Sequence, residues 1–156
     1  MKYYSFIILK PDALERNLVE EIIERFKQND YSIEMIGYKR ISEELIYKHY
    51  HEAIERFGDI MKEKAKIAFV NKYAIPIVIS HEDENIIANA RSFIGATDPF
   101  KAEKGTIRGD LGTDSLDKAM AEGRFCENLI HASDSKSSFK DEVTLWLPNI
   151  GADFSI

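Results

Sequence analysis

The 156-residue sequence contains a single cysteine, Cys126, so no disulfide can form within the chain. One thiol is typical of proteins from a reducing compartment, and we expect a cytoplasmic location. Long apolar stretches are lacking as well. The run Tyr3 to Leu9 is too short to span a membrane and is ended by Lys10 and Pro11, so we expect no signal segment and no membrane association.

Positive charge is also limited, with 21 Lys and Arg against 27 Asp and Glu and a formal net charge of −6. Proteins that bind nucleic acid neutralise its phosphates with Lys and Arg, so this balance argues against a general polyanion binder. We therefore expect no specific nucleic-acid partner. A small anionic ligand in a local basic pocket remains compatible with the composition.

What is abundant fits one globular domain over residues 1–156. Hydrophobic residues make up 44% of the chain and charged residues 31%, which is enough for a sizeable core. The sequence contains neither an internal repeat nor a low-complexity tract.

Hydrophobic periodicity and turn residues predict strands at 3–9, 31–41, 74–80 and 127–130. They predict helices at 17–28, 42–56, 59–71, 82–95 and 135–147, and a short helix at 114–121 within a long loop over 96–127. Pro76 indicates an edge position or an irregularity in the third strand. The order predicts an α+β class with a ferredoxin-like βαββαβ fold. In this fold a four-stranded antiparallel sheet has helices packed on one face, and an extended loop precedes the last strand.

The stretch NLIHASDSKSSF places His131 between an apolar pair and the start of a helix. One interpretation is a core histidine satisfied by hydrogen bonds. A zinc site is disfavoured, because His49 and His51 are two residues apart and point in different directions on a helix. A catalytic triad of His131, Ser133 and Asp134 is disfavoured, because such close neighbours cannot readily line up end to end.

A further interpretation groups His131 with cationic side chains at element ends and in loops, namely Lys10, Arg91 and Arg108. Together they could form an anion pocket in an acidic protein. A neutral imidazole is a competent nucleophile toward phosphorus when its other nitrogen is held by an acceptor, and Glu142 on the following helix is a candidate acceptor.

The octet NLIHASDS resembles the active-site signature of nucleoside diphosphate kinases, usually Asn-hydrophobic-hydrophobic-His-Gly-Ser-Asp-Ser. Other segments agree in order: ILKPDALERNLVEEII near the start, His49-Tyr50, ARSFIGATDPFKAEKGTIRGD in the middle and FKDEVTLWLP near the end. The chain is thus similar to this family over nearly its whole length.

The resemblance implies a reversible ping-pong transfer of the γ-phosphoryl group from ATP or another NTP to a nucleoside diphosphate, through a phosphohistidine at His131. Tyr50 would act near the transferred group, and Ser133 and Glu142 would orient the imidazole. The implied nucleotide-binding residues are Lys10, Arg91, Thr97, Arg108 and Asn128, with Phe57 as the candidate that stacks on the base. Mg²⁺ would arrive bound to the nucleotide phosphates, with no metal ligand from the protein. Family members assemble as hexamers, tetramers or dimers, so we expect a homo-oligomer.

The chain departs from the family pattern in three places. Ala132 replaces the usual glycine, which would cost on the order of 1 kcal/mol if that position needed a positive φ. The segment 111–127 is longer than usual and is expected to lie over the nucleotide or against a neighbouring subunit. The usual Arg-Pro-Phe-Phe is missing, so Phe57, Ile60 and Met61 are all candidates for base stacking.

Other functions remain alternatives to this enzyme. One is a catalytically inactive, nucleotide-binding regulatory module of the same fold. Another is a ferredoxin-like nucleic-acid binder, against which the net charge and the missing RNP-type aromatic motif argue. The apolar tail NIGADFSI could pack on a neighbouring subunit.

Overall fold

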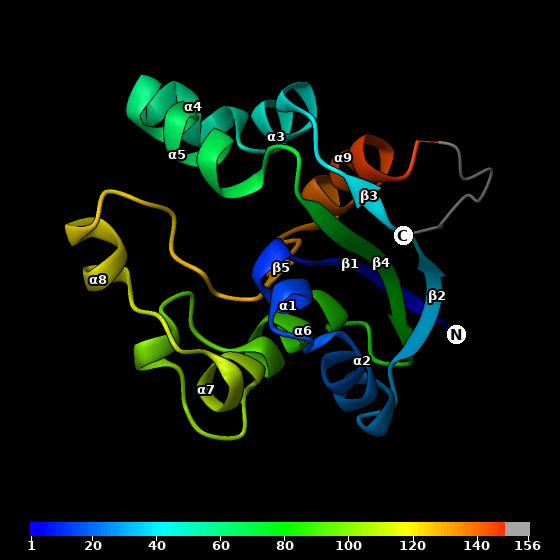
Figure 1. The fold of residues 1–156 in the computed structure, drawn as a ribbon. Coiled ribbons are helices and arrows are strands. Elements are labelled where there is room, and N and C mark those ends of the chain that lie inside the picture. Colours follow the sequence, from blue (N-terminus) through cyan, green and yellow to red (C-terminus); the bar gives the residue numbers. More distant parts are fainter. Residues whose placement is uncertain (149–156) are drawn as a thin grey trace.

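The computed structural model describes residues 1–148, and its centre is an antiparallel sheet with the strand order β2-β4-β1-β5 (Figure 1). The strands are β1 (Tyr3–Leu9), β2 (Ser32–Ile36), β4 (Tyr73–His81) and β5 (Ile130–Ala132), and the short β3 (Lys39–Arg40) pairs with the start of β4. The predicted α+β, ferredoxin-like class is confirmed.

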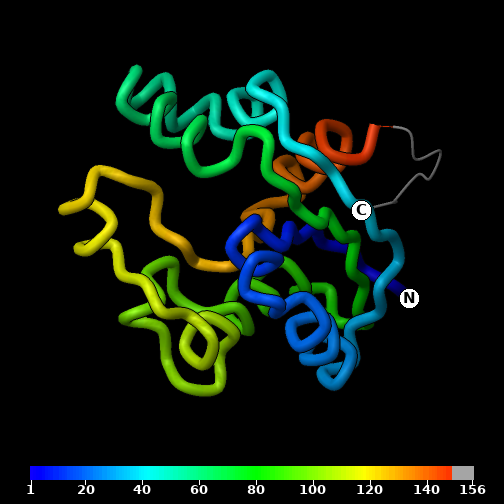
Figure 2. Tube along the Cα trace, viewed as in Figure 1, coloured from blue at the N-terminus to red at the C-terminus, as the bar shows by residue number. Residues whose placement is uncertain are grey.

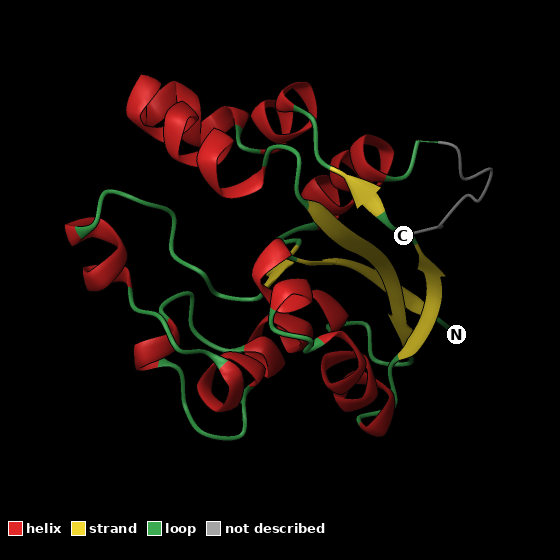
Figure 3. Cartoon of the chain, in the orientation of Figure 1, coloured by secondary structure: helices red, strands yellow, loops and turns green. Residues whose placement is uncertain are grey.

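Helices cover both faces of the sheet, so the prediction of a single covered face is wrong (Figure 3). Phe6 and Ile8 of β1 join one core, and Ile7 and Leu9 join the other. Every one of these four side chains is buried. This packing explains why β1 is a continuous apolar run. A strand that is buried on both faces has no solvent-facing positions for polar residues.

Each core has its own set of helices. One core packs α1 (Pro11–Glu15), α2 (Val19–Gln28), α6 (Ile86–Ile94) and α7 (Ile107–Leu111) against the sheet, and the other packs α3 (Glu43–His49), α5 (Asp59–Phe69) and α9 (Lys136–Trp146). The remaining helical elements are α4 (His51–Phe57), η1 (Pro99–Lys101) and α8 (Leu116–Ala121).

Several predicted boundaries differ from the observed ones. The short α1 was missed, the predicted helix 42–56 is interrupted at Tyr50, and the predicted strand 31–41 is divided into β2 and β3. The last strand is predicted at 127–130 but lies at Ile130–Ala132, so His131 is inside the strand rather than after it. Local apolar content cannot fix such limits, because pairing with a neighbouring strand decides where a short strand begins.

Pro76 lies in β4, which has β1 on one side and β2 on the other, so the edge position is wrong and the irregularity is confirmed. The carbonyl of Pro76 accepts from the N–H of Gly37, in the gap between β2 and β3. The missing proline N–H therefore falls where the ladder on that side is already interrupted.

Residues 112–127 follow α7 and form an arm that carries α8 and returns alongside α5, where Phe125 contacts Phe69 (Figure 2). Within residues 1–148, no helix has both the length and the apolar character needed to cross a membrane. The apolar tail falls on residues 149–156, outside the described part of the chain.

Candidate active site

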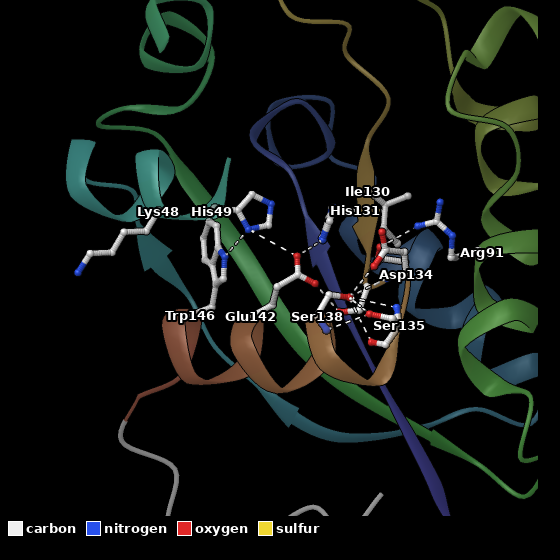
Figure 4. Close-up of polar contacts among 12 residues, drawn as sticks. Lys48, His49, Arg91, Ile130, His131, Asp134, Ser135, Ser138, Glu142 and Trp146 are labelled. Atoms are coloured by element: carbon white, nitrogen blue, oxygen red, sulfur yellow. Dashed lines mark hydrogen bonds and ion pairs between the residues drawn. The ribbon is translucent and has the colours of Figure 1, made fainter. Parts of the chain in front are cut away.

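His131 lies in β5 opposite Ile8 of β1, and α9 brings a carboxylate to it. The Nε2 atom of His131 is 2.5 Å from Oε2 of Glu142, and the hydroxyl of Ser133 donates to Oε1 at 2.5 Å (Figure 4). An ionised carboxylate only accepts, so Nε2 of His131 carries the proton and Nδ1 keeps its lone pair. In its neutral form the imidazole is thus oriented with Nδ1 as the nucleophilic nitrogen.

The start of α9 explains why Glu142 is held in place. Ser135 is the N-cap, and its hydroxyl accepts from the N–H of Ser138 while the Ser138 hydroxyl accepts from the N–H of Ser135. A reciprocal capping box satisfies the free N–H groups at a helix start and fixes the direction in which the helix leaves. The Ser-Asp-Ser that follows the histidine thus serves the helix that supplies the carboxylate.

Leu129 has φ of +72°, a conformation that is uncommon for a residue with a branched side chain. The N–H of Ile130 donates to the carbonyl of Asn128 across it, which makes a tight three-residue turn. The N–H of Leu129 donates to the buried carboxylate of Asp12, and its carbonyl accepts from the N–H of Lys10. Lys10 and Asp12, at the junction of β1 and α1, therefore hold the strained turn that leads into β5.

Lys10 follows β1 directly, and its Nζ donates to Oδ1 of Asn128 at 2.7 Å. The ammonium lies 5.5 Å from the ring centre of Phe69 and 5.9 Å from that of Phe125. Burial lowers the pKa of Lys10 to about 8. The charge is thus kept in an enclosed aromatic environment, where its attraction for an anion is stronger than in water.

Arg108 ties together the loops around the site. Its guanidinium donates to the carbonyls of Gly95, Asn128 and Ile130, at 3.0, 3.1 and 2.5 Å. Burial lowers its pKa to about 10. Arg91, from α6, donates to the carbonyl of Ala132 at 3.1 Å.

Arg91, Thr97, Arg108 and Ala132 line a cavity of about 140 Å³. No carboxylate of the described chain lines it, although the protein as a whole is acidic. The carbonyl of Thr97 accepts from the side-chain amide of Asn128 at 3.0 Å, which ties this cavity to Lys10. A hollow with two guanidinium groups and no acid is suited to phosphate oxygens.

Tyr50 lies at the junction of α3 and α4, with its ring against Phe69 and Phe125. Burial, with Glu142 as the next cause, raises the pKa of its hydroxyl, which stays protonated at neutral pH. Tyr50, Arg91, His131 and Glu142 all line a cavity of about 370 Å³. The imidazole of His131 therefore faces a cavity that is also lined by a tyrosine and an arginine.

Phe57 does not join this group. Its side chain is 60% exposed at the end of α4, where the guanidinium of Arg56 lies over the ring, and it lines none of the cavities described above. Ile60, the second stacking candidate, is also exposed. Ala132 lies in β5 and is not among the described residues with positive φ, so the replacement of glycine there has no backbone cost.

Sequence reasoning missed several residues that surround the site. His49 and Trp146 lie beside Glu142, Phe125 covers Lys10, and Asp12 holds Leu129. The sequence gives His49 only as the neighbour of Tyr50 and in a disfavoured zinc site, and Asp12 only within the segment ILKPDALERNLVEEII. Residues from such distant segments are brought together by packing, which no local pattern records.

His49, His131 and Glu142 are the one group in residues 1–148 whose ligand atoms lie close enough together for a metal ion. The indole N–H of Trp146 donates to Nδ1 of His49 at 3.0 Å. Since an imidazole nitrogen has one lone pair, the nitrogen that faces Glu142 is already used. The three side chains therefore form a hydrogen-bonded cluster with Trp146.

Comparison with known proteins gives a consistent result. The family model described as nucleoside diphosphate kinase matches residues 4–151. A nucleoside diphosphate kinase of Microcystis aeruginosa is 39% identical over 142 residues, covering 91% of this chain and 85% of that protein.

Two solved structures are similar over nearly the whole chain. One is a transition-state mimic of the nucleoside-diphosphate kinase from Borrelia burgdorferi with bound vanadate and ADP, with a TM-score of 0.85, 26% identity and coverage of 93% of this chain and 86% of that one. The other is an NDP kinase from Pyrobaculum aerophilum, with a TM-score of 0.80, 31% identity and coverage of 94% and 96%.

Proposed function

The chain belongs to the nucleoside diphosphate kinase family and is a nucleoside diphosphate kinase, and from this we propose that His131 carries the phosphoryl group between donor and acceptor. The observation that supports this role is the contact of Nε2 with Glu142, which leaves Nδ1 with its lone pair beside a cavity that contains Arg91. The whole of residues 1–156 would form one such catalytic domain.

In the first half-reaction, Nδ1 of His131 attacks the γ-phosphorus of the donor. The N–P bond forms, the bond from γ-phosphorus to the bridging oxygen breaks, and the nucleoside diphosphate leaves with the electron pair. The ring becomes an imidazolium, and its Nε2–H remains bonded to Glu142, which stabilises the new positive charge. In the second half-reaction, a terminal phosphate oxygen of the acceptor attacks the phosphohistidine and releases His131.

The surrounding residues bind and align the phosphates. Arg91, Thr97 and Arg108 would hold the outer phosphates, while Lys10 and Asn128 would contact the sugar hydroxyl region and the reacting phosphates. Tyr50 would donate a hydrogen bond from its hydroxyl near the transferred group, and Ser133 would keep Glu142 oriented. Phosphoryl transfer depends mainly on such alignment and charge stabilisation. ADP and vanadate in the similar Borrelia enzyme support a site of this kind.

Mg²⁺ fits this site as a companion of the nucleotide. The phosphate cavity offers cationic side chains, and Glu142 is engaged by His131 and Ser133, so the ion would be held by phosphate oxygens and water. When bound there, it would supply charge neutralisation to the phosphates.

We further propose a cytoplasmic homo-oligomer that is a hexamer, tetramer or dimer. The outermost strand β2 carries Ile36, which is 56% exposed, and beyond it Tyr38 stacks on Tyr73 at 4.7 Å. An apolar surface beside an open sheet edge is typical of a subunit contact. Analytical ultracentrifugation measures the number of subunits.

The test is phosphoenzyme formation with γ-labelled ATP and Mg²⁺. We expect an acid-labile, base-stable label on the wild type and none on His131→Ala. Full labelling of His131→Ala would contradict the assignment. A wild type that binds nucleotide without taking up label would be the inactive regulatory module instead.

A further inference from the structure

His49 is a buried histidine that the phosphoryl transfer described above leaves without a role. It ends α3, and its side chain is only 3% exposed. Its ring packs edge-on against that of His131, with centres 4.6 Å apart and an interplanar angle of 78°. Figure 4 shows His49, Glu142 and Trp146 turned toward one another beside His131.

Trp146 determines which nitrogen of His49 carries the proton. The indole Nε1–H only donates, and it lies 3.0 Å from Nδ1 of His49, so Nδ1 must hold a lone pair. Burial, with His131 as the next cause, lowers the pKa of His49 well below its ordinary value, so the ring is neutral. The proton of His49 is therefore on Nε2.

The same Nδ1 atom lies 3.7 Å from Oε2 of Glu142, the oxygen that Nε2 of His131 contacts at 2.5 Å. A proton on Nδ1 of His49 would need a shift of less than 1 Å to form a hydrogen bond to this oxygen. Glu142 would then be shared between two imidazoles, and its hold on His131 would weaken. The unprotonated Nδ1 avoids this competition.

We propose that Trp146 is a positioning residue for phosphoryl transfer, because its indole N–H keeps His49 in the tautomer that leaves Glu142 to His131. The proposal rests on His131 as the phosphorylated residue. Trp146 acts through His49, to which its indole N–H donates.

The direct test is the tautomer of His49, read from ¹⁵N–¹H correlation spectra of the folded protein. We expect Nε2–H in the wild type and a shift toward Nδ1–H in Trp146→Phe, which keeps an aromatic ring but removes the donor. An Nδ1–H tautomer in the wild type, or an unchanged tautomer in Trp146→Phe, would overturn the proposal. This readout needs no turnover, so it is separate from the test of the phosphohistidine.

The kinetic test is the rate at which His131 takes up label from γ-labelled ATP in a single turnover. We expect Trp146→Phe to be slower than wild type by about tenfold, because the imidazole of His131 would be less firmly oriented. Removing the competitor as well, in Trp146→Phe/His49→Leu, should bring the rate back to within about threefold of wild type. Val78→Ala, a truncation of a β4 side chain in the same core, is the control for lost packing and should label at the wild-type rate.

A Trp146→Phe enzyme that labels as fast as wild type would refute the role. So would a double variant that stays as slow as Trp146→Phe, because the loss would then come from packing and not from His49. If the wild type itself takes up no label on His131, the proposed function fails, and the tautomer measurement still stands.

Discussion

At the scale of single residues, Lys10 is a positively charged side chain in a buried position. The rings of Phe69 and Phe125 lie on its ammonium, and its hydrogen-bond partner is Asn128. Because burial disfavours the charged form, its pKa falls from an ordinary 10.5 to about 8. The residue proposed to contact the reacting phosphates therefore titrates close to physiological pH.

The pH dependence of kcat/KM tests this property. Lys10 is charged below pH 8 and neutral above it, so we expect kcat/KM to fall as the pH rises through about 8. In Lys10→Arg, whose guanidinium keeps its charge, this fall of kcat/KM should move to higher pH, even if the overall rate is lower. An identical falling limb in both proteins would assign it to another group.

At the scale of one element, the arm of residues 112–127 is fastened by an ion pair. The guanidinium of Arg124 forms two hydrogen bonds with the buried carboxylate of Asp114, at 2.7 and 2.9 Å, and the N–H of Glu127 donates to the same carboxylate. The next residue, Phe125, is thereby kept over Lys10. Residues 123–127 of the arm and residues of α5 together line a cavity of about 130 Å³.

Arg124→Gln tests this fastening. The variant leaves the Asp114 carboxylate without its cation, and we expect the free energy of unfolding to fall by about 1–3 kcal/mol. The arm should be cleaved faster by protease, and the falling limb assigned to Lys10 should move to higher pH as the ammonium becomes hydrated. Arg16→Gln, exposed at the end of α1, is the matched control. It should change neither the free energy of unfolding, nor the rate of cleavage, nor the pH at which kcat/KM falls.

The difference in unfolding free energy between wild type and Arg124→Gln should also depend on pH. Arg124 holds the pKa of Asp114 well below its ordinary value of 3.8, so the stabilisation is present above that pH and is lost as the pH falls below it. The unfolding free energies of wild type and Arg124→Gln should therefore converge in acid. A difference that stayed constant down to pH 2 would contradict the ion pair.

At the scale of the whole molecule, two cores share one sheet. Ile22 is buried in the core beneath α2 and Ile46 in the core beneath α3, on opposite faces. Since β1 contributes alternate side chains to both cores, neither face can come apart without exposing the other. The described domain should unfold as one cooperative unit.

Ile22→Val and Ile46→Val test the cooperation of the two faces. Each should lower the free energy of unfolding by about 0.5–1.5 kcal/mol, and the double variant should lose the sum, because the sites share no contacts. The fluorescence of Trp146, which lies in the Ile46 core and is the only tryptophan, should report the same midpoint in urea as far-UV circular dichroism. Separate midpoints would indicate that the faces unfold independently.

The sequence by itself was sufficient for the class of fold, the family and the phosphate-binding candidates. The alternation of apolar and polar residues, the turn residues and the NLIHASDS octet are local features. Such features can be recognised in the sequence without knowledge of the tertiary structure. The same reading placed Glu142 as the acceptor for His131, and the structure brings the two within 2.5 Å. Phe57 remains a prediction for the base-stacking residue, on a helix end exposed to solvent.

Only the tertiary structure decided which distant residues meet. The covering of both faces of the sheet, the turn at Leu129 held by Asp12, the ring of Phe125 over Lys10 and the bond from Trp146 to His49 all join segments far apart in the chain. Such contacts depend on how the helices pack across the sheet. Packing is set by the shapes of many side chains at once, and no short stretch of sequence contains that information.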